Sequence, residues 1–256
     1  MVLKMSKLLE EQVPSLKDQA DWWDSWNLKH RTGTLEVLDE ATIRRGTKVL
    51  EFCKSLPSVQ RTICEIGCGT GWLCERLFEF GSVTGVDLSS RAIESARFRL
   101  PGATFIAGDF FDISLPVESF DIVIALETIS YVNDQSQFFS KLASLVKPHG
   151  YVIITSVNKF VFERRDDVKP PGAGQIRKWL SKQDILNLFK ADFKIISVDT
   201  VLPCGNRGIL RVTNSYKINK ILEVFFPPAR IEAFKESLGL GQSIVIVAQK
   251  RPSHNK

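Results

Sequence analysis

The chain has 256 residues, 44% of them hydrophobic and 25% charged, and its 34 basic and 29 acidic residues give a formal net charge of +5. This composition is typical of a globular domain and excludes a mainly disordered chain. No run of like charge indicates a nucleic-acid-binding arm. Five cysteines lie scattered without a C-x-x-C pair, which argues against a disulfide framework or a zinc site and predicts no metal and a reducing compartment.

Residues 1–33 are predicted to form a helical N-terminal cap. Leu8, Leu9 and Val13 fit one face of a short helix that Pro14 ends. Charged residues interrupt the apolar ones here, so neither a signal peptide nor a membrane span is expected. We therefore expect a cytoplasmic protein with no membrane partner.

Three tryptophans follow, Trp22, Trp23 and Trp26. Helical spacing puts Trp26 on the same face as Trp22 or Trp23. Two interpretations remain open. The indoles either dock this helix on the body of the protein, or they form an aromatic lid over a bound molecule, because indole faces attract cations.

A helix is predicted over 34–56, closed by Pro57, and then comes the most informative stretch, TICEIGCGTGWL at 62–73. It is a short apolar strand that ends in an acid and three alternating glycines. Glycine tolerates positive φ and lets backbone N–H groups approach a ligand closely. A dinucleotide-binding fingerprint would need its third glycine at Trp72 or Cys74, and a phosphate-binding P-loop would need Gly-Lys-Ser/Thr after the run. The sequence has neither, which disfavours both kinds of nucleotide-binding loop.

Further strands carry acids at their ends. After a helix over 71–80, the strand VTGVD ends in Asp87. In doubly wound sheets, an acid at the end of the second strand accepts the ribose hydroxyls of a cofactor; the alternative is a helix cap before Ser89. A helix runs on to Leu100, and the third strand, ATFIAGD, leads to Asp109.

The second half continues the alternation of strands and helices. FDIVIAL, 120–126, is continuously apolar, as a strand buried on both faces requires. A helix over 136–146 and a turn at 147–150 lead into the fifth strand. A helix from Ser181, the sixth strand over 193–202 and the seventh over 243–250 complete the chain. The order predicts a doubly wound, mostly parallel seven-stranded α/β sheet.

Two segments exceed what this pattern needs and are predicted insertions. Residues 158–181 contain six basic and three acidic residues, and they form either a solvated loop or a lid. In the lid interpretation Arg164, Arg165 or Arg177 meets a carboxylate or phosphate on the substrate. Residues 203–242 are predicted to hold two helices, around 219–224 and 229–238. That insertion is either a wall of the substrate pocket or a dimer surface, so monomer and homodimer both remain open.

The motif E-x-G-x-G-x-G, Asp87 and Asp109-Phe110 in this order resemble the class I S-adenosylmethionine (SAM)-dependent methyltransferases. The resemblance covers roughly residues 60–200, and 243–250 by pattern. It implies a Rossmann-like SAM-binding catalytic domain over 34–256, with SAM as cofactor. In that family the acid at Asp109 hydrogen-bonds the adenine amine and the next residue packs on the ring. The implied cofactor-binding residues are Glu65, Gly67, Cys68, Gly69, Gly71, Asp87, Leu88, Asp109, Phe110 and Leu126.

The same resemblance implies that the end of the fourth strand faces the reacting methyl group. Glu127 and Tyr131 are the expected catalytic residues. Many relatives that methylate oxygen carry a histidine where Tyr131 falls, so a histidine base is not expected. The D/N-P-P-Y/F signature of nucleic-acid amino methyltransferases is absent, which disfavours a nucleic-acid partner. The expected substrate-contacting residues are Trp22, Trp23, Trp26, Tyr131, Arg164 and Arg177.

The function predicted from the resemblance is methyl transfer from SAM to an N or O atom of a small-molecule acceptor, which is anionic if the arginines contact it. Such a transfer mainly needs the nucleophile held in line and water kept out. Two alternatives remain. The same cofactor serves aminocarboxypropyl transfer or cyclisation in other enzymes, because the fold does not choose which bond breaks. The chain could also be a non-catalytic SAM-binding regulator.

Overall fold

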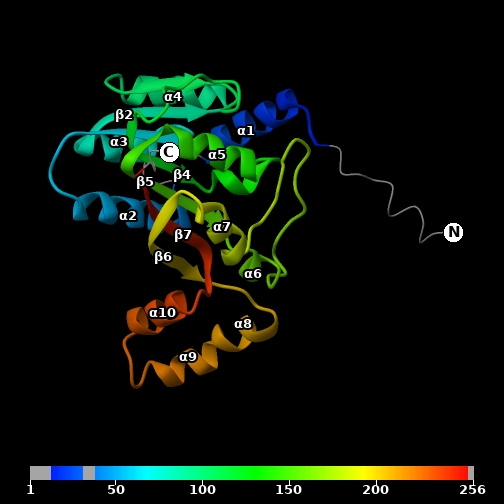
Figure 1. The fold of residues 1–256 in the computed structure, drawn as a ribbon. Coiled ribbons are helices and arrows are strands. Elements are labelled where there is room, and N and C mark those ends of the chain that lie inside the picture. The colour runs from blue at the N-terminus through cyan, green and yellow to red at the C-terminus, as the bar shows by residue number, and fades with distance from the viewer. Residues whose placement is uncertain (1–12, 31–37, 253–256) are drawn as a thin grey trace.

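The computed structural model describes residues 13–30 and 38–252 (Figure 1). These residues contain one seven-stranded sheet in the order β3-β2-β1-β4-β5-β7-β6. β1 to β5 run parallel, and β7 is antiparallel to both β5 and β6. The predicted doubly wound fold is confirmed. The strands are β1 Arg61–Ile66, β2 Gly81–Asp87, β3 Thr104–Ala107, β4 Phe120–Leu126, β5 Val146–Val157, β6 Phe193–Pro203 and β7 Gly241–Lys250.

Helices cover both faces of the sheet. The elements are α1 Leu16–His30, α2 Glu40–Ser55, α3 Trp72–Leu77, α4 Ser90–Arg99, α5 Gln135–Leu145, α6 Lys159–Phe162 and α7 Lys182–Phe189, with 3-10 turns η3 Phe78–Phe80 and η4 Thr128–Tyr131. One buried cluster joins α2, α3 and α4 to one face of the sheet, and a second joins α5 and α7 to the other. None of the helices in the described part of the chain is long and apolar enough to cross a membrane.

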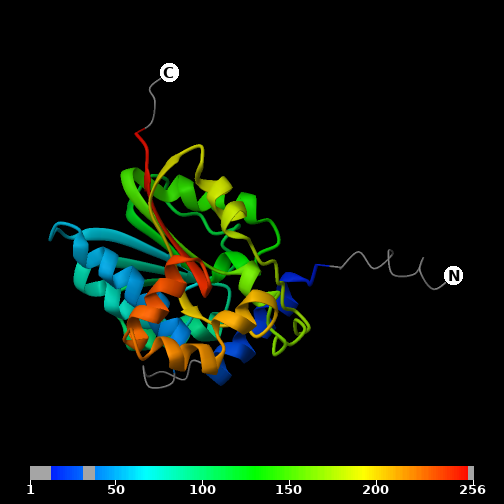
Figure 2. The same ribbon diagram turned by 90° about the horizontal axis from the view of Figure 1, so that it is seen from below.

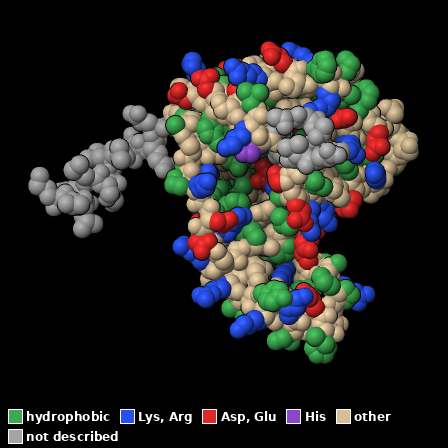
Figure 3. All heavy atoms as spheres, turned by 180° about the vertical axis from the view of Figure 1, so that it is seen from behind, with side chains coloured by type: hydrophobic (Ala, Val, Ile, Leu, Met, Phe, Trp, Pro, Cys, Tyr) green, Lys and Arg blue, Asp and Glu red, His purple; other side chains and the backbone are tan. Residues whose placement is uncertain are grey.

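The 203–242 insertion forms three helices rather than the two predicted: α8 Gly208–Thr213, α9 Tyr216–Leu222 and α10 Pro228–Ser237. They lie together below the sheet in Figure 1, and nearest the viewer in Figure 2. In the space-filling view they make up the lower lobe (Figure 3). Arg44 of α2 forms ion pairs with Glu232 and Glu236 of α10, which ties the lobe to the body.

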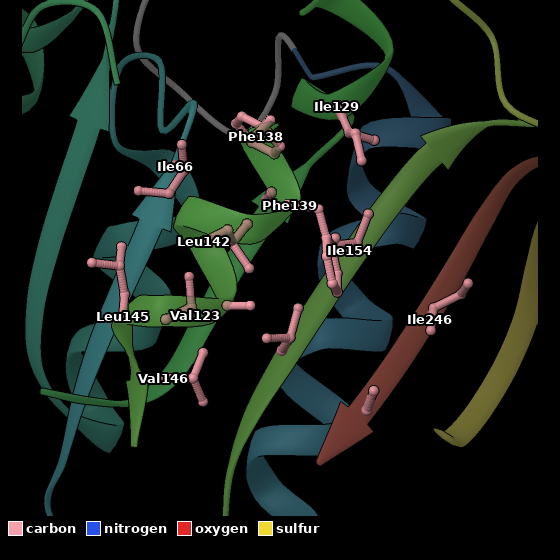
Figure 4. Close-up of a cluster of buried hydrophobic side chains, with 14 of the residues drawn as sticks. Ile66, Val123, Ile129, Phe138, Phe139, Leu142, Leu145, Val146, Ile154 and Ile246 are labelled. Carbon is pink, nitrogen blue, oxygen red and sulfur yellow. The ribbon is translucent and has the colours of Figure 1, made fainter. Parts of the chain in front are cut away.

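Strand residues alternate between the two helical layers. Ile122 and Ile124 of β4 belong to the α2–α4 side, whereas Val123 and Ala125 belong to the α5 side. Figure 4 shows the α5 side, where Phe138, Phe139, Leu142 and Leu145 of α5 gather with Ile66 of β1, Val123 of β4 and Ile154 of β5. The residues drawn there are nearly all fully buried. β4 is therefore apolar on both faces, as its sequence predicted.

Side-chain caps fix where the helices begin. Asp39 accepts a hydrogen bond from the backbone N–H of Thr42, so α2 starts at Glu40. The prediction of a helix from residue 34 is therefore wrong at 38–39, and 34–37 lie outside the described residues, as do Leu8 and Leu9. Ser89 caps α4, and Ser181 forms a capping box on α7 with Asp184, as predicted.

The predicted turn at 147–150 is instead part of β5. Val146 already pairs with Phe120, and the register shifts before Ile122 pairs with Tyr151. His149 takes up the extra length with a left-handed φ of 64°. The segment is thus a bulge inside the strand, at the end of the sheet opposite the loop at 67–71.

Candidate active site

A cavity of about 500 Å³ opens at the carboxyl ends of β1, β2 and β4. In doubly wound sheets this edge is where ligands bind. Gly67 and Gly69 of the glycine loop, Asp87, Asp109 and Glu127 line the cavity, together with parts of α1 and α2, whereas Gly71 does not reach it. The structure therefore brings together residues from six separate parts of the chain.

The turn after β1 needs glycine. Gly67, Gly69 and Gly71 have φ of 78°, 53° and 77°, in the left-handed region that favours glycine. A Cβ on Gly67 would lie 2.0 Å from Oγ1 of Thr128, and that hydroxyl donates to the Ile66 carbonyl at 2.9 Å. A side chain at 67 would therefore displace η4, which borders the cavity.

The carboxylate of Asp87 lies beside this turn. Its two oxygens accept hydrogen bonds from the backbone N–H groups of Gly69, at 2.7 Å, and Ser89, at 2.8 Å. Burial raises the pKa of Asp87, and these two hydrogen bonds oppose the rise. The cap of α4 is Ser89, so Asp87 does not serve as the helix cap that was the alternative. Each carboxylate oxygen keeps acceptor capacity for a ligand hydroxyl.

Glu65 is buried beside the loop and reaches the wall of the cavity. Its side chain is 1% exposed and accepts a hydrogen bond from the thiol of Cys74 at 3.0 Å. Burial raises the pKa of Glu65 to about 8. The carboxyl group is therefore largely protonated at neutral pH and has an O–H to donate.

The third predicted cofactor contact lies after β3. Asp109 lines the cavity and accepts a hydrogen bond from the backbone N–H of Phe111 at 3.0 Å. Phe110 packs edge-on against Phe138 of α5, with ring centroids 5.3 Å apart. Both aromatic side chains reach the cavity wall, and Cys68, Leu88 and Leu126 line it as well.

α1 covers the cavity. Trp22, Trp23 and Trp26 all line it, and the Trp23 ring lies 5.1 Å from that of Tyr131 in an edge-to-face contact. The helix is also docked, because Asp24 accepts a hydrogen bond from the Ser89 hydroxyl. Both interpretations of the tryptophans therefore describe part of the arrangement: the helix is docked, and its indoles face the cavity.

Arg45 and Glu127 meet at the end of the cavity away from Asp87. The Arg45 Nε lies 3.8 Å from Oε1 of Glu127, and the two side chains are only 12% and 15% exposed. Arg45 donates from Nη1 to the Ser243 hydroxyl at 3.1 Å and from Nη2 to the Thr42 hydroxyl at 2.8 Å. Its buried Nε has no hydrogen-bond acceptor among the described residues.

The surroundings of Glu127 and Tyr131 shift the pKa of both side chains. Glu127 has a left-handed φ of 62°, and burial raises the pKa of its carboxyl, opposed by the charge of Arg45. Burial, with the nearby charge of Glu127, raises the pKa of Tyr131 to about 12. The phenol therefore stays protonated at neutral pH. This favours Glu127 over Tyr131 as the candidate base, and a catalytic part for Tyr131 stays a prediction.

The substrate contacts expected of Arg164 and Arg177 stay a prediction. Arg164 and Arg177 do not line the cavity, because each guanidinium bonds its own segment: Arg164 donates to the Phe160 carbonyl, and Arg177 to the Lys169 carbonyl and the Gln175 amide oxygen. Residues 158–181 instead contribute Phe162, Gln175 and Ile176 to the wall. From residues 203–242 only Gln242 reaches it, so the three-helix lobe is not a pocket wall.

The cavity also contains Arg45, Thr42 and Ser243, which no sequence pattern indicates. Arg45 follows Arg44 in a helix of ordinary composition. The sequence does not show that Arg45 turns into the cavity whereas Arg44 pairs with α10. Ser243 is the first residue of the predicted seventh strand, a position where a polar side chain is expected to face solvent. Within residues 13–30 and 38–252, no group of three or more His, Cys, Asp or Glu side chains is arranged to hold a metal ion.

Comparison with known proteins identifies the family. A family model described as a methyltransferase domain matches residues 58–213. A ubiquinone biosynthesis O-methyltransferase from Rhodopseudomonas palustris is 31% identical over 153 residues, which are 56% of this chain and 59% of that protein. The chain thus spans less than two thirds of the length of this curated relative.

Two solved structures show the same fold. The N-methyltransferase NodS from Bradyrhizobium japonicum, in complex with S-adenosyl-L-homocysteine, has a TM-score of 0.60 and 15% identity over 92% of this chain and 100% of that chain. The cyclase SpnF has a TM-score of 0.55 and 15% identity over 80% of this chain and 81% of that chain.

The matched family model covers more than half of the chain. The chain therefore belongs to the methyltransferase-domain family and, with its sheet order β3-β2-β1-β4-β5-β7-β6, to the class I SAM-dependent methyltransferases. SAM is the cofactor of that class. The resemblance inferred from the glycine motif, Asp87 and Asp109-Phe110 is confirmed, whereas the roles assigned to individual side chains stay predictions.

Proposed function

We propose that the chain transfers the methyl group of SAM to a hydroxyl oxygen of a small acceptor with an apolar, partly aromatic body. The observation that carries this proposal is the cavity, which is continuous from the glycine loop to the Arg45–Glu127 pair and is roofed by the tryptophans of α1. One end offers the residues that the resemblance assigns to the cofactor. The other offers an acid and a cation beside apolar surface.

At the cofactor end, the residues present fit an adenosyl group. The backbone at 67–71 leaves room for close approach, Asp87 accepts ribose hydroxyls, Asp109 accepts the adenine amine, and Phe110 packs on the ring. When bound, SAM supplies a methyl group made electrophilic by its positively charged sulfur. The chain's part is to orient this group toward Glu127 and keep water away from it.

At the acceptor end, Phe162, Ile176 and the α1 indoles enclose the acceptor's apolar body. Its hydroxyl lies between Glu127 and Arg45. Glu127 accepts the hydroxyl proton as general base, a role that contributes typically 10²- to 10⁴-fold. The Nε–H of Arg45, which has no hydrogen-bond acceptor among the described residues, donates to the same oxygen and stabilises the charge that develops there.

Oxygen is favoured over nitrogen as the acceptor atom by this pair and by the O-methyltransferase name of the 31% identical relative. A neutral amine attacks without a base, and a cationic amine would meet the Arg45 charge. The fold alone does not decide the chemistry, since the cyclase SpnF has it too.

The test is product analysis with the purified chain, SAM and matched panels of phenols, alcohols and amines. We expect a methylated phenol or alcohol, with S-adenosylhomocysteine formed in equal amount. Methylthioadenosine as by-product would show attack on another bond of the cofactor, as in aminocarboxypropyl transfer. Cofactor binding in calorimetry without any product across all panels would favour the non-catalytic alternative.

A further inference from the structure

The three-helix lobe carries an unusual share of the exposed apolar side chains. Among the described residues, twenty large hydrophobic side chains are exposed, and ten of these fall within residues 209–238. They are Ile209, Val212, Tyr216, Ile218, Ile221, Val224, Phe225, Phe226, Phe234 and Leu238. Apolar side chains gathered in this way mark an interaction surface, and we call these ten the lobe surface.

The turn between α9 and α10 holds three consecutive exposed apolar side chains. Val224, Phe225 and Phe226 are consecutive and are 77%, 71% and 51% exposed. Ile218, Ile221 and Phe225 follow one another at spacings of three and four, so they share one side of α9 and its continuation. The following Pro227 and Pro228 begin α10, Pro227 as its N-cap and Pro228 as its first residue.

The charges of the lobe are divided between its two sides. Residues 204–240 contain six basic and three acidic residues. The acidic Glu232 and Glu236 face the body, where both pair with Arg44, and Glu223 pairs with Lys220 on its own helix. By contrast, the side chains of Arg207, Arg211, Lys217 and Arg230 form no ion pair with any described residue. The outward charge is therefore positive.

The shape and charge of the lobe limit which kind of partner can bind the lobe surface. Figure 1 shows α8–α10 projecting from the sheet, and Figure 3 shows hydrophobic side chains at the end of the lower lobe interspersed with Lys and Arg. The surface projects instead of forming a groove that would hold a peptide. A second copy placed face to face would bring two positive surfaces together, which opposes association.

We propose that the lobe surface docks on an anionic phospholipid bilayer. Phe225 and Phe226 enter the interface between headgroups and acyl chains, while Arg211, Lys217 and Arg230 contact lipid phosphates. The lobe then rests on the membrane without spanning it. This revises the expectation of no membrane partner, which considered only signal and spanning segments. The proposal does not depend on which acceptor is methylated.

The experiment is co-sedimentation of the full chain with phosphatidylcholine vesicles, with and without phosphatidylglycerol. The variants are Phe225→Ser/Phe226→Ser and Arg211→Gln/Lys217→Gln. The matched control is Phe98→Ser, because Phe98 is 92% exposed on α4, away from the lobe. Thermal unfolding and calorimetry with S-adenosylhomocysteine verify that every variant is folded and still binds the cofactor product.

We expect the wild-type chain and Phe98→Ser to bind vesicles that contain phosphatidylglycerol, and more weakly at high salt. The phenylalanine variant should lose at least about tenfold in partitioning, because two exposed rings no longer leave water. The arginine and lysine variant should lose most of the salt dependence. Equal sedimentation of the phenylalanine variant and the control would overturn the proposal. So would a concentration-dependent dimer in light scattering that this variant abolishes, since a second copy would then be the occupant.

Discussion

Arg45 and Glu127 face each other across 3.8 Å at the acceptor end of the cavity, each largely buried. A buried ion pair stabilises a fold only modestly, because desolvation offsets the attraction between its charges. The pair is better explained by a role in the reaction, in which Glu127 accepts a proton from an acceptor hydroxyl and Arg45 donates a hydrogen bond to its oxygen. Glu127 has the raised pKa that suits a base, and Arg45 has a buried donor without a hydrogen-bond acceptor among the described residues.

Glu127→Gln tests the base directly. The amide keeps the shape but cannot accept the proton, so we expect kcat to fall by about 10²- to 10⁴-fold with little change in cofactor affinity. Wild-type activity should rise with pH through the elevated pKa of Glu127, because only the carboxylate is active. Glu51→Gln, an exposed position on α2, is the matched control. Equal kcat in both variants would remove Glu127 from the reaction.

Glu65 makes a separate prediction for stability. Its pKa is about 8 in the folded protein against 4.5 when unperturbed. Between these values the folded state holds a proton that the unfolded state has lost, so the free energy of unfolding falls as pH rises, by about 1.4 kcal/mol per pH unit at most. Denaturant titrations of the cofactor-free chain between pH 5 and pH 8 should show this fall, and it should be shallower in Glu65→Gln, where only the raised pKa values of Asp87 and Glu127 still contribute. Parallel pH profiles would contradict it.

At the scale of elements, α1 is held in place by a polar side chain in its middle and by its tryptophans. Asp24 bonds Ser89 at the start of α4, and Oδ1 of Asn27 lies 3.4 Å from where a Cβ of Gly69 would be. The helix therefore touches the cofactor loop on one side and, through Trp23, Tyr131 on the other. One element thus contributes to both halves of the cavity.

Trp23→Ala should separate these two contributions. Removing the indole opens the roof over the acceptor, so we expect the acceptor KM to rise about tenfold or more from the lost apolar contact, while cofactor affinity changes little. Leu28→Ala, at a 53% exposed position on the same helix, controls for changes in helix stability. Initial rates over a range of acceptor concentrations measure the effect. An unchanged KM would mean that the indole only docks the helix.

Asp87→Ala addresses the loop and β2 together. We expect cofactor binding to weaken by about 1–3 kcal/mol, because the ribose hydroxyls lose their charged acceptor. Part of that loss would come from the loop, since Asp87 also holds Gly69 in place. Asp87→Asn, which retains one carbonyl acceptor, should lie between the wild type and Asp87→Ala. Calorimetry with S-adenosylhomocysteine measures all three, and equal affinities would remove Asp87 from the site.

For the whole molecule, the sequence predicted the parts that local patterns determine. The glycine motif, the acid after β2 and the doubly apolar β4 lie close in sequence to what they build, so the sheet and cofactor edge could be predicted. Arg45 could not, because its neighbours in the cavity, Glu127 and Ser243, are distant in sequence. The local hydrogen bonds of Arg164 and Arg177 could not be predicted either, because charge composition does not show that each bonds its own loop.

The helices of the 203–242 insertion also divide into those that local sequence predicts and one that depends on tertiary contacts. The proline pair at 227–228 predicted a break between two helices, and the structure has α9 and α10 on either side of it. α8 was missed because GNRGIL contains two glycines, which disfavour helix by propensity. Packing of Leu210, which is fully buried, overrides that propensity. Tertiary contacts therefore decide the elements that patterns leave undetermined.

The most direct test of the account is a crystal structure of the chain with S-adenosylhomocysteine and a methylated product bound. The account predicts the adenosyl group along the loop at 67–71, its ribose on Asp87, and its sulfur directed toward a product oxygen that lies between Arg45 and Glu127. A sulfur directed away from these two side chains, with the product bound elsewhere, would contradict it.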